Sequence, residues 1–341
     1  METENFAVKR TAILVLALLV LCLPGSAQAQ YKLATTEKLG GEGGWDYLTY
    51  EPGAHRLLIT RGTHVMVIDT NTLKPAGDIP DLTGIHGVAL APQMNKGFIS
   101  NGGDDSVVVF DLKTLKATDK IKVGNRPDAI VYDPVSKHVF AFNAKSQDST
   151  VIDAASGKVL ATLPLGGQPE ASAADGKGKV FVNIEDKNEI AAIDTHSNAV
   201  TARWALKGCE GPSAFALDAA HGRLFSGCHN KLMAVTDASS GATVATTPIC
   251  SGVDAGDFNP KTQEAFMSCG DGTLAVIHED SPDKYSARQT VQTQRGARTM
   301  ALDTDTNAIY LVTAQFGEKG PNDRRPPVIP GTFVLLVVKP E

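Results

Sequence analysis

Residues 124–166 read GNRPDAIVYDPVSKHVFAFNAKSQDSTVIDAASGKVLATLPLG and contain four short runs in which apolar residues alternate with others. Clusters of Gly, Pro, Asp, Asn and Ser separate the runs. Runs of this length with a period of two are typical of antiparallel strands, which we expect at 129–132, 138–142, 149–152 and 159–163. A single four-stranded sheet cannot bury both of its faces, so it requires neighbours of the same kind.

The same pattern recurs along the chain at a nearly constant interval. The Asp that ends the third run, Asp153, recurs every 41 to 43 residues, at Asp69, Asp111, Asp194 and Asp237. A sixth copy has His278 in the same place, 41 residues further on. We expect each Asp to accept backbone N–H bonds in the turn into the fourth strand. A four-strand unit repeated at this interval predicts a β-propeller.

The two ends of the repeat region are predicted to share one blade. The last unit shows three clear strands, at 299–302, 308–312 and 333–338, and a lone strand at 31–39 precedes the first unit. We expect the lone strand to be the outermost strand of the last blade, which closes the ring and removes an exposed edge. The prediction is an all-β, seven-bladed propeller with four-stranded antiparallel blades, formed by residues 30–341 as a single domain.

Residues 1–29 have the pattern of a secretory signal peptide. Lys9-Arg10 is followed by an apolar stretch of 12 residues, at 12–23, and by Ala27-Gln28-Ala29 as a cleavage site. The apolar stretch is too short to span a bilayer comfortably. We therefore expect a periplasmic or secreted protein with no membrane span after cleavage. A formal net charge of −6 also argues against nucleic acid as a partner.

The repeat resembles a known family. The segments PDAIVYDPVSKHVFAFN, at 127–143, and DSTVID, at 148–153, are similar to the YVTN-type (YncE-like) seven-bladed β-propellers of exported bacterial proteins. The resemblance covers nearly all of the chain after residue 29 and implies the same fold. It says little about activity, because propellers include hydrolases, redox subunits and binding modules.

One residue per blade is predicted to face the mouth of the central channel. The position just before each first apolar run recurs every 40 to 44 residues, and we call these seven residues the ring: Asp46, His86, Asp128, Glu170, Ser213, Asp254 and Arg298. Two interpretations stay open, a water-filled polar channel and a binding site for a small molecule or a protein. Crowded carboxylates are expected to raise one another's pKa. Further polar residues lie near the same rim: Arg126, Glu210 and Arg295.

Four adjacent ring residues are also metal-ligand candidates. Asp46, His86, Asp128 and Glu170 could hold Ca²⁺ or Mg²⁺ through their oxygens, or Zn²⁺ with the imidazole. No other cofactor is expected. Among the remaining histidines, those in hairpins on the rim face are the better site candidates: His64 and His229. Those in turns of the opposite face are expected to be surface imidazoles: His55, His138 and His221.

The cysteines outside the signal peptide follow the repeat. Cys209 and Cys228 are 19 residues apart, as are Cys250 and Cys269, and the two pairs are displaced by 41 residues, one blade. Export favours oxidation, and the repeat symmetry predicts the disulfides Cys209–Cys228 and Cys250–Cys269. A Cys₄ metal site is the alternative, although no C-x-x-C spacing supports it.

The hairpin between the second and third strands of the last blade is unusually long. Residues 314–332 read AQFGEKGPNDRRPPVIPGT and include four prolines. Such a segment is predicted to be stiff and extended. It is either a lid over the channel mouth, with Arg324 and Arg325 facing the acidic ring, or a solvent-exposed decoration.

Two classes of function follow from these features. The first is a non-catalytic binding or scaffold propeller, acting as a monomer on a small molecule or a protein at the channel face. The alternative is a lactonase-like or other metal-assisted hydrolase that uses the acidic channel. The sequence has no G-x-S-x-G, Walker or H-E-x-x-H motif. Single-stranded nucleic-acid binding would need a basic groove with exposed aromatics, which an aromatic content of 6 % does not favour.

Overall fold

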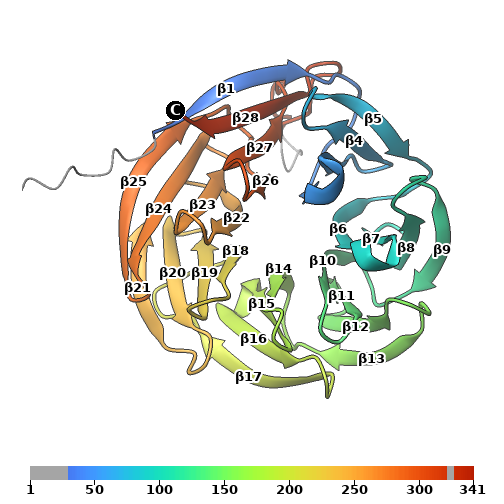
Figure 1. Cartoon of the computed structure of the whole chain (residues 1–341), viewed down its shortest axis with the longest axis vertical. Coiled ribbons are helices and arrows are strands. Elements are labelled where there is room, and N and C mark those ends of the chain that lie inside the picture. The colour runs from blue at the N-terminus through green and yellow to red at the C-terminus, as the bar shows by residue number, and fades with distance from the viewer. Residues whose placement is uncertain (1–29, 321–325) are drawn as a thin grey trace, which may run out of the picture.

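The computed structural model describes residues 30–320 and 326–341, which form seven four-stranded antiparallel sheets arranged as a ring (Figure 1). This confirms the predicted seven-bladed β-propeller. The signal peptide predicted for residues 1–29 lies outside the described residues. In the part of the chain that is described, no helix has the length and apolar character needed to cross a bilayer.

Each blade runs outwards from the centre of the ring. The innermost strands are β2 (Leu48–Glu51), β6 (Ile85–Ala91), β10 (Pro127–Asp133), β14 (Pro169–Ala174), β18 (Pro212–Asp218), β22 (Val253–Asn259) and β26 (Met300–Asp303). The second strands are β3 (Arg56–Thr60), β7 (Lys96–Asn101), β11 (His138–Asn143), β15 (Lys179–Ile184), β19 (Arg223–Cys228), β23 (Glu264–Cys269) and β27 (Ala308–Thr313).

The third strands are β4 (Val65–Asp69), β8 (Ser106–Asp111), β12 (Asp148–Asp153), β16 (Glu189–Asp194), β20 (Leu232–Asp237), β24 (Thr273–Ser281) and β28 (Val334–Pro340). The outermost strands are β5 (Lys74–Ile79), β9 (Ala117–Lys122), β13 (Val159–Pro164), β17 (Ala199–Ala205), β21 (Thr243–Pro248), β25 (Lys284–Gln292) and β1 (Tyr31–Lys38). Short 3₁₀ turns are η1 (Pro52–Ala54), η2 (Pro92–Met94) and η3 (Glu185–Lys187).

The ring closes through the N-terminal strand, as predicted. Strand β1 pairs antiparallel with β28, from Tyr31 opposite Pro340 to Lys38 opposite Val334. The Tyr31 ring packs edge-on against Phe266 of blade six at 5.3 Å, and its hydroxyl donates to Glu264. The first described strand thus ties the last two blades together and covers the edge of β28 that would otherwise be exposed.

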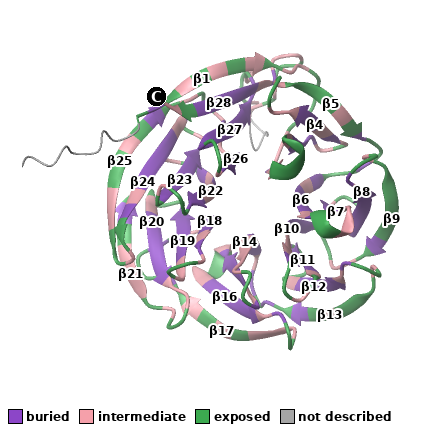
Figure 2. Cartoon of the chain, viewed as in Figure 1, coloured by how far each residue is buried: buried purple, intermediate pink, exposed green. Residues whose placement is uncertain are grey.

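The hydrophobic core lies between the blades. Among the described residues, the buried apolar side chains form seven clusters, and each cluster joins two neighbouring blades. The outermost strands are mostly exposed or half-buried, whereas the second and third strands are almost wholly buried (Figure 2). A blade therefore depends on its neighbours for burial, which explains why the repeat has to close on itself.

The regular spacing of these Asp residues along the chain reflects a turn, as predicted from the sequence. In blade two, Asp111 Oδ1 accepts from the backbone N–H of Lys113 at 3.0 Å and of Thr114 at 2.8 Å. Blade six has His278 instead, and its third and fourth strands β24 and β25 extend to nine residues each, against six for β12 and β13 of blade three. Losing the Asp turn thus lengthens one hairpin.

Candidate ligand site at the channel mouth

Five ring residues leave the regular strand ladder at a β-bulge. In blades two to six, the pairing of the innermost strand with the second strand skips the ring position: His86, Asp128, Glu170, Ser213 and Asp254. A bulge bends the strand and redirects the side chain of the extra residue. The other two ring residues, Asp46 and Arg298, each lie two residues before the start of the innermost strand, β2 or β26.

A cavity of about 490 Å³ lies where the ring residues meet. All seven line it, which bears out their predicted convergence, and they are joined by Tyr47, Arg126, Gln168, Glu185 and His229. The lining has five carboxyl groups against two guanidinium groups and two imidazoles. The cavity is therefore polar and has an excess of negative charge.

Ion pairs link the ring residues on one side of the cavity. His86 Nδ1 lies 2.6 Å from Asp46 Oδ2 and 3.6 Å from Asp128 Oδ1. Arg298 Nε lies 2.7 Å from Asp254 Oδ2, and its Nη2 lies 3.6 Å from Asp46 Oδ1. Two basic groups thus hold Asp46 and Asp254 in place and compensate their charges.

The remaining two ring carboxyl groups are poorly compensated. Burial, with the nearby charges of Asp128, Glu185 and Asp254, raises the pKa of Glu170 to about 9. Burial likewise raises the pKa of Asp128 to about 6, although the His86 charge opposes the shift. These shifts agree with the crowding predicted from the sequence, but burial contributes more than mutual repulsion.

Burial and the nearby carboxylates also shift the pKa values of two other groups in the cavity. Burial opposes the charged form of His86, but the hydrogen bond to Asp46 and the charges of Asp128 and Asp46 outweigh it and raise the pKa of His86. Burial and the surrounding carboxylates raise the pKa of the Tyr47 hydroxyl well above its ordinary value. The cavity therefore favours positive charge and disfavours additional negative charge.

Three of the four predicted metal candidates come together. One ligand atom each from Asp46, His86 and Asp128 lies within 4.8 Å of the other two. Glu170 does not belong to this group. Two carboxylates and one imidazole at this separation suit a divalent cation chemically, as Zn²⁺ and Mn²⁺ take oxygen and nitrogen donors.

A second pocket of about 430 Å³ adjoins the first and shares His229, Asp254 and Arg298 with it. Its other walls are largely apolar and include Trp45, Phe316, Pro326 and Val328. The long hairpin supplies the last three, and a β-bridge between Phe316 and Val328 shapes it. The described part of the predicted lid thus lies beside the channel mouth. Arg324 and Arg325 lie outside the described residues.

A buried arginine that was not predicted from the sequence holds the aromatic wall in place. Arg61, which directly follows the second strand of blade one, donates to the carbonyl oxygens of Glu42 at 2.7 Å and Gly44 at 3.1 Å. Its guanidinium carbon lies 3.6 Å from the centre of the Phe333 ring. Trp45 packs on the same Phe333 at 5.5 Å. Arg61 therefore holds the segment that presents Trp45 to the pocket.

Some of the other predicted rim residues line the two pockets and others do not. His229 lines both pockets, Arg126 lines the polar cavity, and Arg295 lines the aromatic pocket. Glu210 lines neither, and His64 lies beside Asp78 at 3.8 Å, away from the channel. The cavity-lining residues that sequence analysis missed are Tyr47, Gln168 and Glu185. Glu185 follows a second strand directly, so an alignment of rim hairpins would have placed it near the mouth.

Both predicted disulfides are present. Cys209 bonds to Cys228 and Cys250 to Cys269, each closing a loop with a sequence separation of 19. The alternative Cys₄ metal site is therefore wrong. The bridges tie the segment before the innermost strand to the end of the second strand in blades five and six. They brace the rim next to Ser213, Asp254 and His229.

Comparison with known proteins supports the fold. No family model matches the chain, and no curated protein matches it, so the resemblance to YVTN-type propellers stays a prediction. Among solved structures, a chain of "Kuenenia stuttgartiensis Hydrazine Synthase" is similar with a TM-score of 0.70 and 16 % identity over 85 % of this chain and 95 % of that one. A chain of "Crystal Structure of Mitotic Checkpoint Complex" has a TM-score of 0.73 and 13 % identity over 89 % and 95 %. At these identities the likeness concerns the seven-bladed architecture alone.

Proposed function

We propose that this protein is an exported, non-catalytic binding propeller that captures a small organic ligand at the channel mouth. The observation that carries the proposal is the adjoining pair of pockets, one acidic and one aromatic, that share His229, Asp254 and Arg298. The ligand that fits both combines a positively charged amine with an apolar, ring-containing part. Pockets with a few convergent polar groups beside apolar walls are the usual form of small-molecule sites.

The amine is matched by the two poorly compensated carboxyl groups. The pKa of Asp128 is about 6, so its carboxyl group is ionised at neutral pH. Its one ion pair among the described residues is with His86 at 3.6 Å. Glu170 keeps its proton at neutral pH because its pKa is about 9. An ammonium group near both would stabilise their charged forms and offset the burial that raises both pKa values.

The apolar part is matched by the aromatic pocket. Trp45 and Phe316 have ring centres 6.1 Å apart, and Val328 and Pro326 complete the wall. Arg298 lies between the two pockets and has its guanidinium 5.9 Å from the Trp45 ring centre. Aromatic walls bind both flat apolar groups and alkylammonium groups, so they add affinity without adding charge.

The proposal is tested by calorimetry with a matched ligand pair. 2-Phenylethylamine carries the amine, and 3-phenylpropionate carries a carboxylate on a similar apolar part. We expect the amine to bind and the carboxylate to bind at least tenfold more weakly. Asp128→Asn should weaken the amine about tenfold, as for loss of one charge-assisted contact. Glu210→Gln, at the same rim but outside both pockets, should bind like the wild type. Equal binding of the two ligands, or no effect of Asp128→Asn, would refute the proposal.

A metal-assisted hydrolase is the second candidate, and the approach of Asp46, His86 and Asp128 within 4.8 Å is what favours it. In that case a divalent cation on these residues would activate a water molecule. Metal analysis of the purified protein, with thermal unfolding before and after chelation, distinguishes the two. A bound cation that is lost in His86→Gln would favour the hydrolase, and metal-free protein with no chelation effect would eliminate it.

The location and the partners of the protein are part of the same proposal. The signal-peptide pattern of residues 1–29 and the two disulfides support a periplasmic or secreted location. We propose a monomer whose ligand is a small molecule, or a protein side chain of the same chemistry, at the channel face. The acidic lining of the cavity speaks against single-stranded nucleic acid, which needs a basic groove.

A further inference from the structure

A second cluster of acid and imidazole groups lies far from the channel mouth, on the opposite face of the ring. His221 lies in the turn between β18 and β19 of blade five, three residues after Asp218, the last residue of β18. Glu279 comes from the extended β24 of blade six. One ligand atom from each of the three lies within 4.8 Å of the other two. The site therefore joins two blades.

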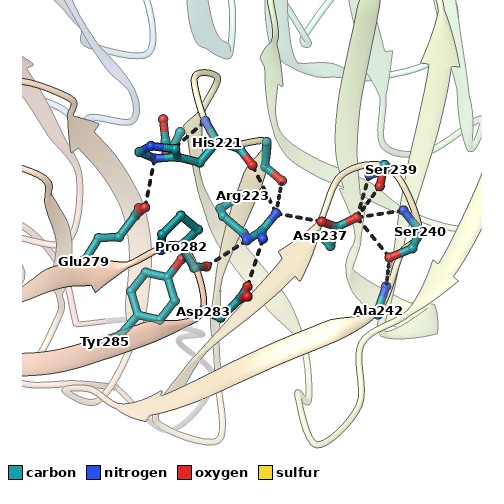
Figure 3. Close-up of polar contacts among 12 residues, drawn as sticks. His221, Arg223, Asp237, Ser239, Ser240, Ala242, Glu279, Pro282, Asp283 and Tyr285 are labelled. Carbon is teal, nitrogen blue, oxygen red and sulfur yellow. Dashed lines mark hydrogen bonds and ion pairs between the residues drawn. The ribbon is translucent and has the colours of Figure 1, made fainter.

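The geometry around His221 leaves one carboxylate without a donor of its own. His221 Nδ1 lies 2.6 Å from Asp218 Oδ2 and 3.0 Å from Glu279 Oε1, as Figure 3 shows for Glu279. One nitrogen can donate only one proton. Asp218 also accepts from the backbone N–H of Ala220 at 2.9 Å. Neither oxygen of Glu279 accepts a well-aligned hydrogen bond from any described residue.

Burial makes this arrangement costly without a cation. The side chains of Asp218 and Glu279 are 2 % and 1 % exposed, whereas the His221 side chain is 41 % exposed. Two carboxylates removed from water beside each other need compensation. Arg223, whose charge acts on Glu279, is already paired with Asp237 at 2.6 Å and Asp283 at 2.8 Å. Its charge is therefore largely committed elsewhere.

The extended hairpin of blade six is held rigidly in this position. Arg223 Nε donates to the carbonyl oxygen of Pro282 at 2.7 Å, and the Tyr285 hydroxyl donates to the same oxygen at 2.7 Å (Figure 3). These contacts anchor the tip of the hairpin on blade five. They bring Glu279 to Asp218 before any ligand arrives, so the donor set is preorganised.

We propose that Asp218, His221 and Glu279 bind a divalent transition-metal ion that links blades five and six. Two carboxylates and one imidazole are donors that Zn²⁺ and Mn²⁺ accept, and the charge of the ion balances the two buried carboxylates. Donor atoms of a tetrahedral zinc site are about 3.3 Å apart, as follows from bonds of about 2.0 Å. The His221 side chain is exposed, and its Nδ1 reaches this separation by moving about 0.7 Å from Asp218 and about 0.3 Å from Glu279. Solvent supplies the fourth ligand.

The test uses Zn²⁺ itself and removes the competing trio at the channel mouth. In the His86→Gln background, we expect equilibrium dialysis to find one Zn²⁺ per chain, and none at the same free Zn²⁺ after addition of Glu279→Gln. Zn²⁺ at 100 times its Kd should raise the Tm of the His86→Gln protein by about 4 °C and leave that of the double variant unchanged. Equal Zn²⁺ binding by the two proteins would overturn the proposal.

A metal-free measurement separates this site from an ordinary ion cluster. Glu279→Gln removes a buried charge but keeps the shape of the side chain. If the cluster is built for a cation, the variant should be at least as stable as its parent in EDTA, because an uncompensated carboxylate has gone. A clear fall in Tm in EDTA would instead show that His221 alone compensates Glu279, and would overturn the proposal.

Discussion

Replacing Glu170 with Gln should stabilise the protein, and more so as the pH rises. The pKa of Glu170 is raised from 4.5 to about 9, first by burial and then by neighbouring carboxylates. The unfolded chain therefore releases this proton near pH 4.5, and the folded protein only near pH 9. Between these values the unfolded state binds fewer protons, so the free energy of unfolding falls as the pH rises. Glutamine keeps the neutral shape and removes this loss.

The size of the effect follows from the shift. Each pH unit above 4.5 costs about 1.4 kcal/mol until the folded protein also ionises, which gives about 3 kcal/mol at pH 7 and under 1 kcal/mol at pH 5. For a domain of this size, 1 kcal/mol corresponds to about 1.5 °C in Tm. Glu170→Gln should therefore raise the Tm by about 5 °C at pH 7 and by about 1 °C at pH 5.

Thermal unfolding followed by circular dichroism at pH 5, 6 and 7 measures this difference. Glu210→Gln is the matched control, because Glu210 lies on the same rim but is exposed and lines neither pocket. Its Tm should follow the wild type at every pH. A Glu170→Gln protein whose advantage does not grow between pH 5 and pH 7, or which is less stable than the wild type, would refute the electrostatic account of the cavity.

Three further predictions concern the scaffold. Replacing Cys209 and Cys228 together by Ser should lower the free energy of unfolding by about 3 kcal/mol in urea titrations, since a loop of this length is no longer closed in the unfolded chain; an unchanged midpoint would contradict this. Tyr31→Ala should cost about 3–5 kcal/mol because it empties a buried site at the ring closure, and a loss below 1 kcal/mol would show that β1 is dispensable. Arg61→Leu should free the loop that carries Trp45, shifting tryptophan emission to the red and weakening 2-phenylethylamine binding; unchanged emission and affinity would contradict its positioning role.

The fold and the ring were accessible from the sequence because they follow the repeat. Aligning the units placed Asp128 and Glu170 at equivalent positions, and the same symmetry paired Cys209 with Cys228. Neither inference needed three-dimensional information beyond the propeller itself. The β-bulges that direct the ring residues inwards were not visible, because a bulge interrupts the period of two without changing the composition of the strand.

The parts that escaped prediction depend on contacts between units that differ. Trp45 and Phe316 meet because an N-terminal loop and the last hairpin converge, and both segments are longer than their counterparts in the other blades. Glu279 reaches Asp218 and His221 only because blade six lacks the Asp turn and extends its hairpin. A hint was present in the sequence, since the interval from Asp254 to Arg298 is the longest between ring positions. The residues that the longer hairpin contacts belong to blade five, so the sequence of blade six alone could not predict them.

The proposed binding mode predicts that the protein releases a proton when the amine binds. An amine beside Asp128 and Glu170 should lower the pKa of Glu170 below neutrality, so that binding at pH 7.5 releases close to one proton. Titration calorimetry of 2-phenylethylamine in two buffers with different ionisation enthalpies measures that release. The account predicts binding with release of about one proton in the wild type and none in Glu170→Gln. Absence of binding, or proton release that is the same in both proteins, would contradict it.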